Sequence, residues 1–295
     1  MPTSTHQPVP GCPVCGSPGR ERLFAKDGWP VARCGSCRLV YVDAVVDRAA
    51  LDRIYGRDYY EGEVFADYLG ESEARLASGR SRAAWLASQM PGGRLLDLGC
   101  AAGFFLLGAS EHFDVTGVEV SEFASHHARE ELGLRVYTGE IFDAPLDDAA
   151  FDAVTMWDVV EHLADPARVL AEVARVTRPG GLLVLTTGDV EGPLAHRDLE
   201  RWDLMCPPAH LQFFSPRTLE MLLNGTGFQV ERMLADGRVS TRPRLSVPVV
   251  QRALGTFGIG NVMTVLARRS ERPRPRVVRA RIPSALRPQR ATSDS

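Results

Sequence analysis

The stretch Leu95-Leu-Asp97-Leu-Gly99-Cys-Ala-Ala-Gly103-Phe104 decides how the chain folds. Its first half is a short apolar run of the kind that forms a buried strand. Its second half is a glycine-rich turn that leads into a helix. Glycine at positions 99 and 103 lets a ligand approach the backbone and lets the helix start close to the strand. This G-x-x-x-G spacing is weak evidence alone, and it differs from the G-x-G-x-x-G of dinucleotide binders.

Strand-like and helix-like segments alternate around this stretch, which predicts parallel βαβ units in a sheet covered by helices on both faces. The expected strands are 94–98, 114–119, 134–138, 151–157, 181–187, 228–234 and 261–267. The expected helices are 71–90, 104–111, 122–131, 165–177 and 215–225. In such a sheet, ligands bind beyond the carboxyl ends of the strands. The second strand ends at Val118-Glu119-Val120, where a carboxylate can accept both hydroxyls of a ribose.

Four motifs in this order resemble those of class I S-adenosylmethionine-dependent methyltransferases. They are LLDLGCAAGFFL from Leu95, VTGVEVS from Val115, FDAVTMWDVVEHLADP from Phe151 and RPGGLLVLTT from Arg178. The segment DVVEHLADP is similar to the branch that includes the ubiquinone and sugar methyltransferases. The resemblance covers residues 91–269. It implies a Rossmann-like α/β fold with a seven-stranded sheet, S-adenosylmethionine as the methyl donor, and methyl transfer as the reaction.

The resemblance also assigns residues to the donor. Asp97 and Gly99 are expected at its amino-acid end, with backbone from Cys100 and Gly103 at the same turn. Glu119 is expected on the ribose hydroxyls and Val120 on the adenine. The turn with Glu140 and Ile141 is expected at the adenine edge, and Trp157 and Asp158 beside the sulfonium.

Two histidines are the candidates for catalysis. His162 follows the fourth strand, and His210 precedes the helix 215–225, so both loops lie at the donor-facing rim. We expect them to converge near the donor methyl, with one acting as base or substrate orienter. Similar sugar C-methyltransferases carry a Glu-His pair at this place, and here Ala209 precedes His210. Tyr59 and Tyr60, in a region resembling the lid over the donor, are candidates for substrate contact or for core packing.

Four of the six cysteines form two pairs that predict a zinc ribbon. Cys12-Pro-Val-Cys15 and Cys34-Gly-Ser-Cys37 are separated by 18 residues. Two such knuckles complete a tetrahedral shell of four thiolates, which Zn²⁺ favours. A closed shell leaves no coordination position for substrate, so the metal is structural. We expect one Zn²⁺ per chain, and loss of a ligand is expected to unfold residues 11–43 while the donor-binding part stays folded.

The resulting division of the chain has four parts. Residues 11–43 are the zinc ribbon, 44–90 a helical and aromatic lid segment, 91–269 the methyltransferase domain, and 270–295 a disordered basic tail. The first ten residues have neither a basic start nor an apolar core, so we expect no secretory signal and a cytoplasmic location. The longest apolar runs fall short of the ~20 residues that span a bilayer, so no membrane partner is expected.

The charge distribution bears on the partner. Residues 238–295 hold thirteen Arg against Glu271 and Asp294, a local net of +11, so residues 1–237 carry −14 of the total of −3. An acidic body argues against nucleic acid on the catalytic face. A four-Cys zinc module before this catalytic type resembles the sugar and natural-product methyltransferases, which implies a small-molecule acceptor, such as a sugar or a natural-product intermediate. The alternatives are a ribosomal RNA base methyltransferase, some of which begin with a zinc module, and a non-catalytic donor-binding protein.

Overall fold

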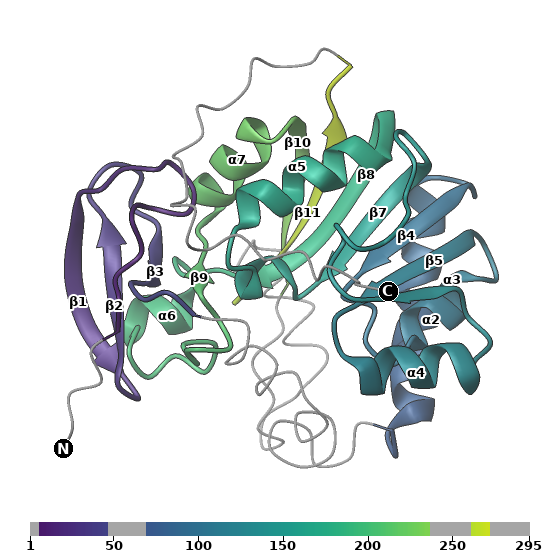
Figure 1. Ribbon diagram of the computed structural model, residues 1–295, viewed down its shortest axis with the longest axis horizontal. Helices are drawn as coiled ribbons and strands as arrows, with labels where there is room; N and C mark the ends of the chain where they lie inside the picture. Colours follow the sequence, from purple (N-terminus) through teal and green to yellow (C-terminus); the bar gives the residue numbers. More distant parts are fainter. Residues whose placement is uncertain (1–5, 47–68, 237–260, 272–295) are drawn as a thin grey trace, which may run out of the picture.

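A computed structural model describes residues 6–46, 69–236 and 261–271 of the chain (Figure 1). Its main feature is a seven-stranded sheet in the order β10-β11-β8-β7-β4-β5-β6. β4 pairs parallel with β5 and β7, β5 with β6, and β7 with β8, whereas β11 runs antiparallel between β8 and β10. The strands are β4 (Arg94–Leu98), β5 (Asp114–Glu119), β6 (Val136–Thr138), β7 (Phe151–Trp157), β8 (Thr177–Gly188), β10 (Phe228–Asp236) and β11 (Val262–Arg269).

The sheet is buried on both faces because its strands are apolar at successive positions. In β8, Leu182 and Val184 pack in one core cluster, whereas Leu183 and Leu185 pack in another. Since side chains alternate across a strand, the two clusters lie on opposite faces. The first face carries α2 and α3 with α4 beside them, and the second carries α5 and α7 (Figure 1). These helices are α2 (Ser72–Gln89), α3 (Phe104–Ala109), α4 (Glu122–Glu130), α5 (Pro166–Val176) and α7 (Pro216–Gly225).

This architecture confirms the predicted α/β fold with its seven-stranded sheet. The observed strands and helices begin and end within a few residues of the predicted ones. The largest difference is β8, which starts at Thr177 instead of residue 181, because the Pro-Gly-Gly segment continues the strand toward β7. Within the described residues, no helix is both long enough and apolar enough to cross a lipid bilayer.

The cysteine-containing segment forms a second, four-stranded sheet in the order β1-β2-β3-β9. β1 (Arg20–Lys26), β2 (Trp29–Cys34) and β3 (Val40–Val42) come from the N-terminal segment, but β9 (Gln212–Phe213) comes from the loop before α7. Val40 pairs with Phe213 and Tyr41 with Gln212 in antiparallel register. The N-terminal sheet is therefore completed by a strand that lies 170 residues further along the chain, counted from Val42 to Gln212.

Both faces of β3 in this small sheet are buried against the rest of the molecule. Leu39 and Tyr41 belong to the same core cluster as residues of the large sheet and Phe214. Val40 and Val42 pack in a separate cluster with Trp202, Met205 and other residues around α6 (Pro193–Arg197). In Figure 1 the N-terminal strands accordingly stand directly against α6 and β9. The predicted ribbon is thus packed into the molecule and shares its core.

Candidate functional site

Two glycines shape the turn between β4 and α3. Gly99 has φ +75° and Gly103 has φ +88°, a backbone region that other residues rarely adopt. A Cβ at position 99 would lie 2.6 Å from Val159 Cγ2, and one at 103 would lie 2.8 Å from Leu134 Cδ1. Gly103 is also the N-cap residue of α3. The glycines therefore let the turn pack tightly against the loops after β7 and α4.

Glu119 lies at the carboxyl end of β5 and is 5% exposed. Its Oε2 accepts a hydrogen bond of 2.8 Å from the backbone N–H of Ala101, and its Oε1 accepts one of 2.8 Å from Ser121. Burial raises the pKa of Glu119, against the lowering effect of these N–H groups. One carboxylate thus ties the β4–α3 turn to the β5–α4 turn. Each oxygen keeps a second lone pair, so a ribose diol can still be accepted.

Asp97 is buried in β4, with 1% of its surface exposed. The Thr155 hydroxyl of β7 donates a 2.6 Å hydrogen bond to its Oδ1. Burial raises the pKa of Asp97 to about 7, although Thr155 and Arg82 act in the opposite direction. A buried carboxyl at the carboxyl end of the central strand is well placed to receive a cationic group from a ligand.

The remaining residues predicted at the donor lie around the same edge of the sheet. Val120 follows Glu119 directly and is 43% exposed, which offers an apolar surface to a flat ring. Ile141 is buried, and the N–H of Glu140 donates to Asp143 Oδ2 at 3.0 Å. The backbone of Cys100 is already engaged. Its N–H lies 3.3 Å from Val118 O of β5, and its carbonyl accepts from Gly103 N–H at 3.0 Å within the turn.

Trp157 and Asp158 end β7 and point into different surroundings. The Trp157 ring packs edge-on against Phe105 at 5.2 Å, and the Arg82 guanidinium lies 4.8 Å from its centroid. Its buried Nε1 has no hydrogen-bond partner among the described residues. Asp158 has φ +56°, and its Oδ1 accepts a 2.8 Å hydrogen bond from the Thr186 hydroxyl of β8. The carboxyl end of β7 therefore presents an indole ring packed against Phe105 and a carboxyl group held by Thr186.

The two candidate catalytic histidines come together, as the fold required. The His162 and His210 rings have centroids 4.6 Å apart and are nearly perpendicular. Nδ1 of His162 lies 2.7 Å from Ala209 O, and Nδ1 of His210 lies 2.7 Å from Leu204 O. Burial lowers the pKa of both, that of His210 to about 3 with the help of His162. Their distance from the donor methyl and their catalytic role stay predictions.

Two residues beside this site, Glu161 and His127, were not predicted from the sequence. Glu161 is 4% exposed, and burial with the nearby Asp158 raises its pKa to about 8. Its Oε2 has no hydrogen-bond partner among the described residues. His127 of α4 lies with Nδ1 3.1 Å from Ala102 O, in the β4–α3 turn. A carboxyl directly before a histidine in the motif DVVEHL was the signal for Glu161, and the sequence contained no signal for His127.

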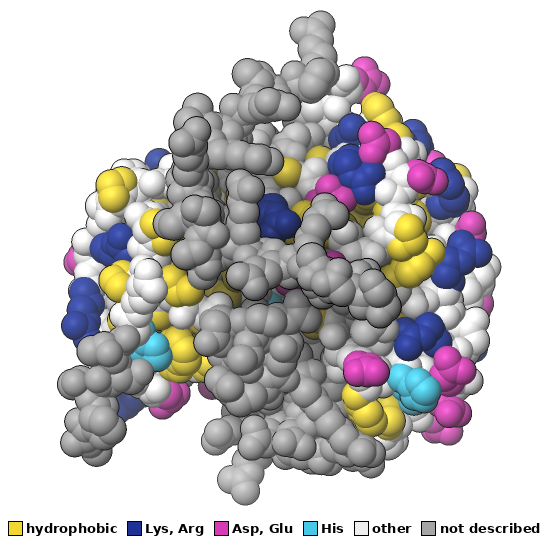
Figure 2. Space-filling view, in the orientation of Figure 1, with side chains coloured by type: hydrophobic (Ala, Val, Ile, Leu, Met, Phe, Trp, Pro, Cys, Tyr) yellow, Lys and Arg dark blue, Asp and Glu magenta, His cyan; other side chains and the backbone are white. Residues whose placement is uncertain are grey.

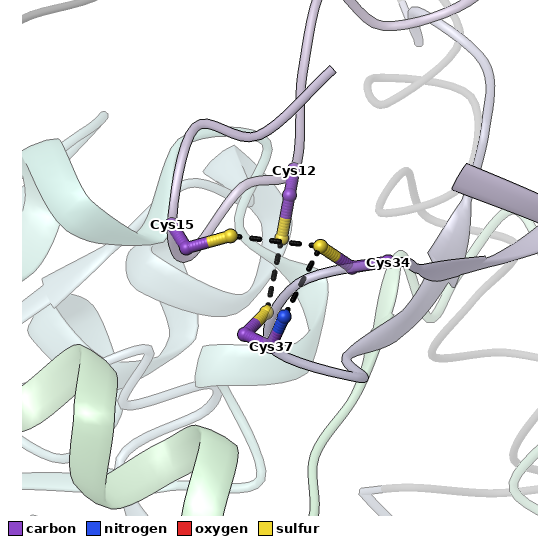
Figure 3. A group of neighbouring side chains, drawn as sticks. All are labelled: Cys12, Cys15, Cys34 and Cys37. Carbon is purple, nitrogen blue, oxygen red and sulfur yellow. Dashed lines mark hydrogen bonds between the residues drawn. The ribbon is translucent and has the colours of Figure 1, made fainter. Parts of the chain in front are cut away.

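The four paired cysteines converge on one point (Figure 3). The Cys12 and Cys37 sulfurs are 3.5 Å apart, as are those of Cys15 and Cys34, and all four lie within 4.8 Å of one another. Zinc–sulfur bonds of ~2.3 Å in a tetrahedron put sulfurs about 3.8 Å apart, so the cluster fits a zinc ion. The N–H groups of Ser36 and Cys37 lie 3.4 and 3.5 Å from Cys34 Sγ and help to lower its pKa to about 7, against the effect of burial.

The two tyrosines predicted to contact the substrate, Tyr59 and Tyr60, fall outside the described residues.

A family model described as a methyltransferase domain matches residues 68–232. The chain is 37% identical over 106 residues to a ubiquinone biosynthesis O-methyltransferase of Alkalilimnicola ehrlichii, covering 33% of this chain and 42% of that protein. It is 31% identical over 160 residues to the 27-O-demethylrifamycin SV methyltransferase of Amycolatopsis mediterranei, covering 48% and 55%. The chain thus spans about half the length of the curated relatives it matches.

The same architecture occurs in solved structures. The magnesium protoporphyrin IX methyltransferase of Synechocystis PCC 6803, solved with bound S-adenosylhomocysteine, superposes with a TM-score of 0.53. The superposition covers 76% of this chain and all of the other, at 16% sequence identity. This likeness concerns the fold.

Proposed function

Because this chain belongs to the class I methyltransferase-domain family, we propose that it transfers a methyl group from S-adenosylmethionine to a small organic acceptor. The observation that carries the proposal is the edge of the sheet at β4 and β5. There the buried carboxyls of Asp97 and Glu119 flank a tight glycine turn, and Val120 exposes an apolar side chain beside them. A cationic amino acid, a ribose and an adenine are the three parts of the donor that these groups would bind.

The donor would supply an electrophilic methyl on a sulfonium, so the protein's task is mainly to position the acceptor in line with it. Asp97 would hold the amino end of the donor and Glu119 its ribose hydroxyls. Burial keeps His162 and His210 neutral near pH 7, and each carries its proton on Nδ1, because a backbone carbonyl can only accept. Rings held in this way can position a neighbouring group, and the low pKa of His210 argues against full proton abstraction by that residue.

A small acceptor is supported by charge and by the relatives. Relatives are named for ubiquinone biosynthesis and for a rifamycin substrate. Acidic and basic side chains are interspersed over the described surface visible in Figure 2, without a basic track for a phosphate backbone. With the −14 net charge of residues 1–237, this favours an acceptor that lacks a polyanionic backbone.

We further propose that the four cysteines hold one structural Zn²⁺. The sulfurs fit the tetrahedral geometry, and three of the four cysteines are buried, which shields the metal from exchange. When bound, the ion would cross-link the 12–15 knuckle to the 34–37 knuckle. These two knuckles flank the sheet of β1, β2 and β3, which abuts the loop carrying His210.

The test combines donor binding with methyl transfer. Titration calorimetry should show binding of S-adenosylmethionine and S-adenosylhomocysteine by wild-type protein, and much weaker binding by the Asp97→Asn variant. Radiolabelled donor is then offered with a small-molecule extract of the source cells and, separately, with their total RNA. Label is expected in the small-molecule fraction. Label in RNA would support the nucleic-acid alternative, and donor binding without label in either fraction would support a non-catalytic protein.

A further inference from the structure

A second cluster of metal-ligating groups lies away from the cysteines, at the junction of the two sheets. Glu161, His162 and His210 each place one ligand atom within 4.8 Å of the others. The four cysteine sulfurs lie equally close, within 4.8 Å of one another. Glu161 and His162 lie in a single 3-10 turn, Val160–His162, after β7, whereas His210 precedes β9. The turn and the loop are joined by the Leu211 N–H, which donates to Glu161 O at 2.8 Å.

Several buried oxygens next to this cluster are left without partners. Glu161 Oε2, Thr187 Oγ1 and Gln212 Oε1 have no hydrogen-bond partner among the described residues. Each of these side chains is at most 4% exposed. An unpaired buried polar atom costs about 1–3 kcal/mol, so three in one place call for a common explanation.

The three oxygens share one small hollow with His210. Glu161, Thr187, His210 and Gln212 line it together with apolar residues that include Trp202 and Phe213. The hollow has no room for a water molecule, so water does not satisfy these groups. Gln212 presents its carbonyl oxygen, and the neutral His210 ring has its lone pair on Nε2. The Thr187 hydroxyl can donate, as can Glu161 in its protonated form. A bound cation would displace that proton and leave Glu161 as a third acceptor.

From this set of groups we propose that Glu161, His162 and His210 bind a divalent transition-metal ion, separate from the cysteine site, with Gln212 or Thr187 in the fourth position. An excess of buried acceptors is what a cation neutralises. Two imidazoles with one carboxylate suit Zn²⁺ and its borderline neighbours better than Ca²⁺ or Mg²⁺. A bare ion bound directly by side chains needs less space than a water. Bonds of ~2.1 Å would draw the ligand atoms to about 3–4 Å from one another.

The surroundings of the histidines support this assignment. A metal-bound histidine usually donates its second ring N–H to a carbonyl or a carboxylate, which fixes the ring and its tautomer. His210 does so with Leu204 O, and His162 with Ala209 O, both at 2.7 Å. The ion would fix the turn after β7 to the loop before β9, and thereby the floor of the acceptor side of the site.

The metal content of untagged protein, purified without chelator and dialysed against buffered zinc, tests the proposal. Wild-type protein should hold two zinc ions per chain, and Glu161→Gln and His210→Ala should each hold one. His196→Ala, which removes an exposed histidine, should keep two. One ion per chain in wild type would overturn the proposal, as would a second ion that persists in the Glu161→Gln, His210→Ala double variant. Because the readout requires neither donor nor acceptor, it is independent of the proposed methyl transfer.

A measurement on the wild-type protein alone covers the case in which the variants do not fold. Cobalt is added to protein whose cysteine site is already filled with zinc. A second site of nitrogen and oxygen ligands should give weak visible cobalt bands and no sulfur-to-cobalt charge-transfer band. Absence of cobalt uptake, or a charge-transfer band that shows cobalt bound by cysteines alone, would contradict the proposal.

Discussion

The role proposed for Asp97 in donor binding would make the affinity for the donor sensitive to pH. The pKa of Asp97 is raised to about 7 by burial, so the donor-free protein holds this group protonated in mildly acidic solution. A cationic donor favours the carboxylate, and binding below pH 7 must therefore release a proton. We predict that donor affinity rises up to tenfold per pH unit as pH increases from about 5.5 to 7, and then levels off.

Calorimetry at several pH values in buffers of different ionisation enthalpy measures this proton release. Asp97→Asn should bind more weakly above pH 7 and lose most of the pH dependence, since it keeps the side-chain size but cannot ionise. The same variant corrects for titration of the donor's own amino group. An equally steep pH profile in Asp97→Asn would assign the proton to another group. Stability of the donor-free protein should change with pH in the opposite direction to donor affinity. Because folding raises the pKa of Asp97, the contribution of this group to the free energy of unfolding falls as pH rises from about 4 to 7.

Glu119 has one observed role, in joining two turns, and one proposed role, in binding the donor, and a single substitution removes both. Its oxygens accept from Ala101 and Ser121, and a donor ribose would use the remaining lone pairs. We predict that Glu119→Ala lowers donor affinity tenfold or more. It should also lower the free energy of unfolding by about 2–4 kcal/mol, because a buried and a partly buried N–H group lose their acceptor.

Calorimetry and urea unfolding of the same sample separate the two effects of this substitution. Glu122→Ala, three residues along and exposed in the first turn of α4, is the matched control and should change neither value by much. An unchanged donor affinity in Glu119→Ala would mean that the ribose is held elsewhere. An unchanged stability would mean that water replaces the carboxylate at both N–H groups.

The first turn of α3 packs closely against α4 because Gly103 has no side chain. A Cβ on Gly103 would lie 2.9 Å from Ala128 Cβ of α4, at φ +88°. We predict that Gly103→Ala lowers the free energy of unfolding by about 2–4 kcal/mol through backbone strain and overlap combined.

Gly133 provides the control that separates strain from overlap. It has φ +66°, but a Cβ there would meet no atom within 4 Å. Gly133→Ala should therefore cost only about 1 kcal/mol. Urea unfolding of both variants measures the difference. Equal losses in the two variants would show that the α3–α4 contact relaxes without cost.

Taken as a whole, the molecule joins the segment that holds the four cysteines to the loop 202–214, which carries His210 and β9. Val42 N–H donates to Leu211 O at 2.9 Å, β3 pairs with β9, and both faces of β3 are buried in shared cores. We predict that loss of a metal ligand, in Cys37→Ser, increases amide hydrogen exchange in residues 31–42 and also in residues 202–214. Exchange in β4 and β7 should change much less.

Hydrogen exchange followed by mass spectrometry resolves these segments. Cys206→Ser is the matched control, because it removes a thiol within the same loop that is not part of the four-cysteine cluster, and it should leave the exchange of 31–42 unchanged. Increased exchange confined to residues 11–43 would support the independent ribbon expected from the sequence. We expect exchange to increase in both segments because residues of β3 share core clusters with the rest of the molecule.

The large sheet could be predicted from the sequence because the residues that specify its strands and turns are close together in the chain. Apolar runs such as Phe151–Trp157 and turns such as Pro179-Gly180-Gly181 specify elements within a few residues, and four motifs in order specify their arrangement. The pairing of β9 with β3 was not predictable, since Gln212 and Phe213 form a two-residue strand whose partner is distant in sequence. The buried, unpartnered state of Glu161 was also hidden, because its motif shows only that it precedes a histidine.

The late arrival of β9 has a consequence for synthesis of the protein on the ribosome. Val42 and Phe213 are 171 residues apart (213 − 42). At 5–20 residues per second, roughly 10 to 35 seconds separate their emergence. During that interval all four cysteines are outside and able to take up metal, while the β3 edge lacks its neighbour and exposes apolar side chains to other nascent chains. A truncated product ending before residue 212 would keep that edge open permanently, and we expect such fragments to aggregate even when zinc-loaded.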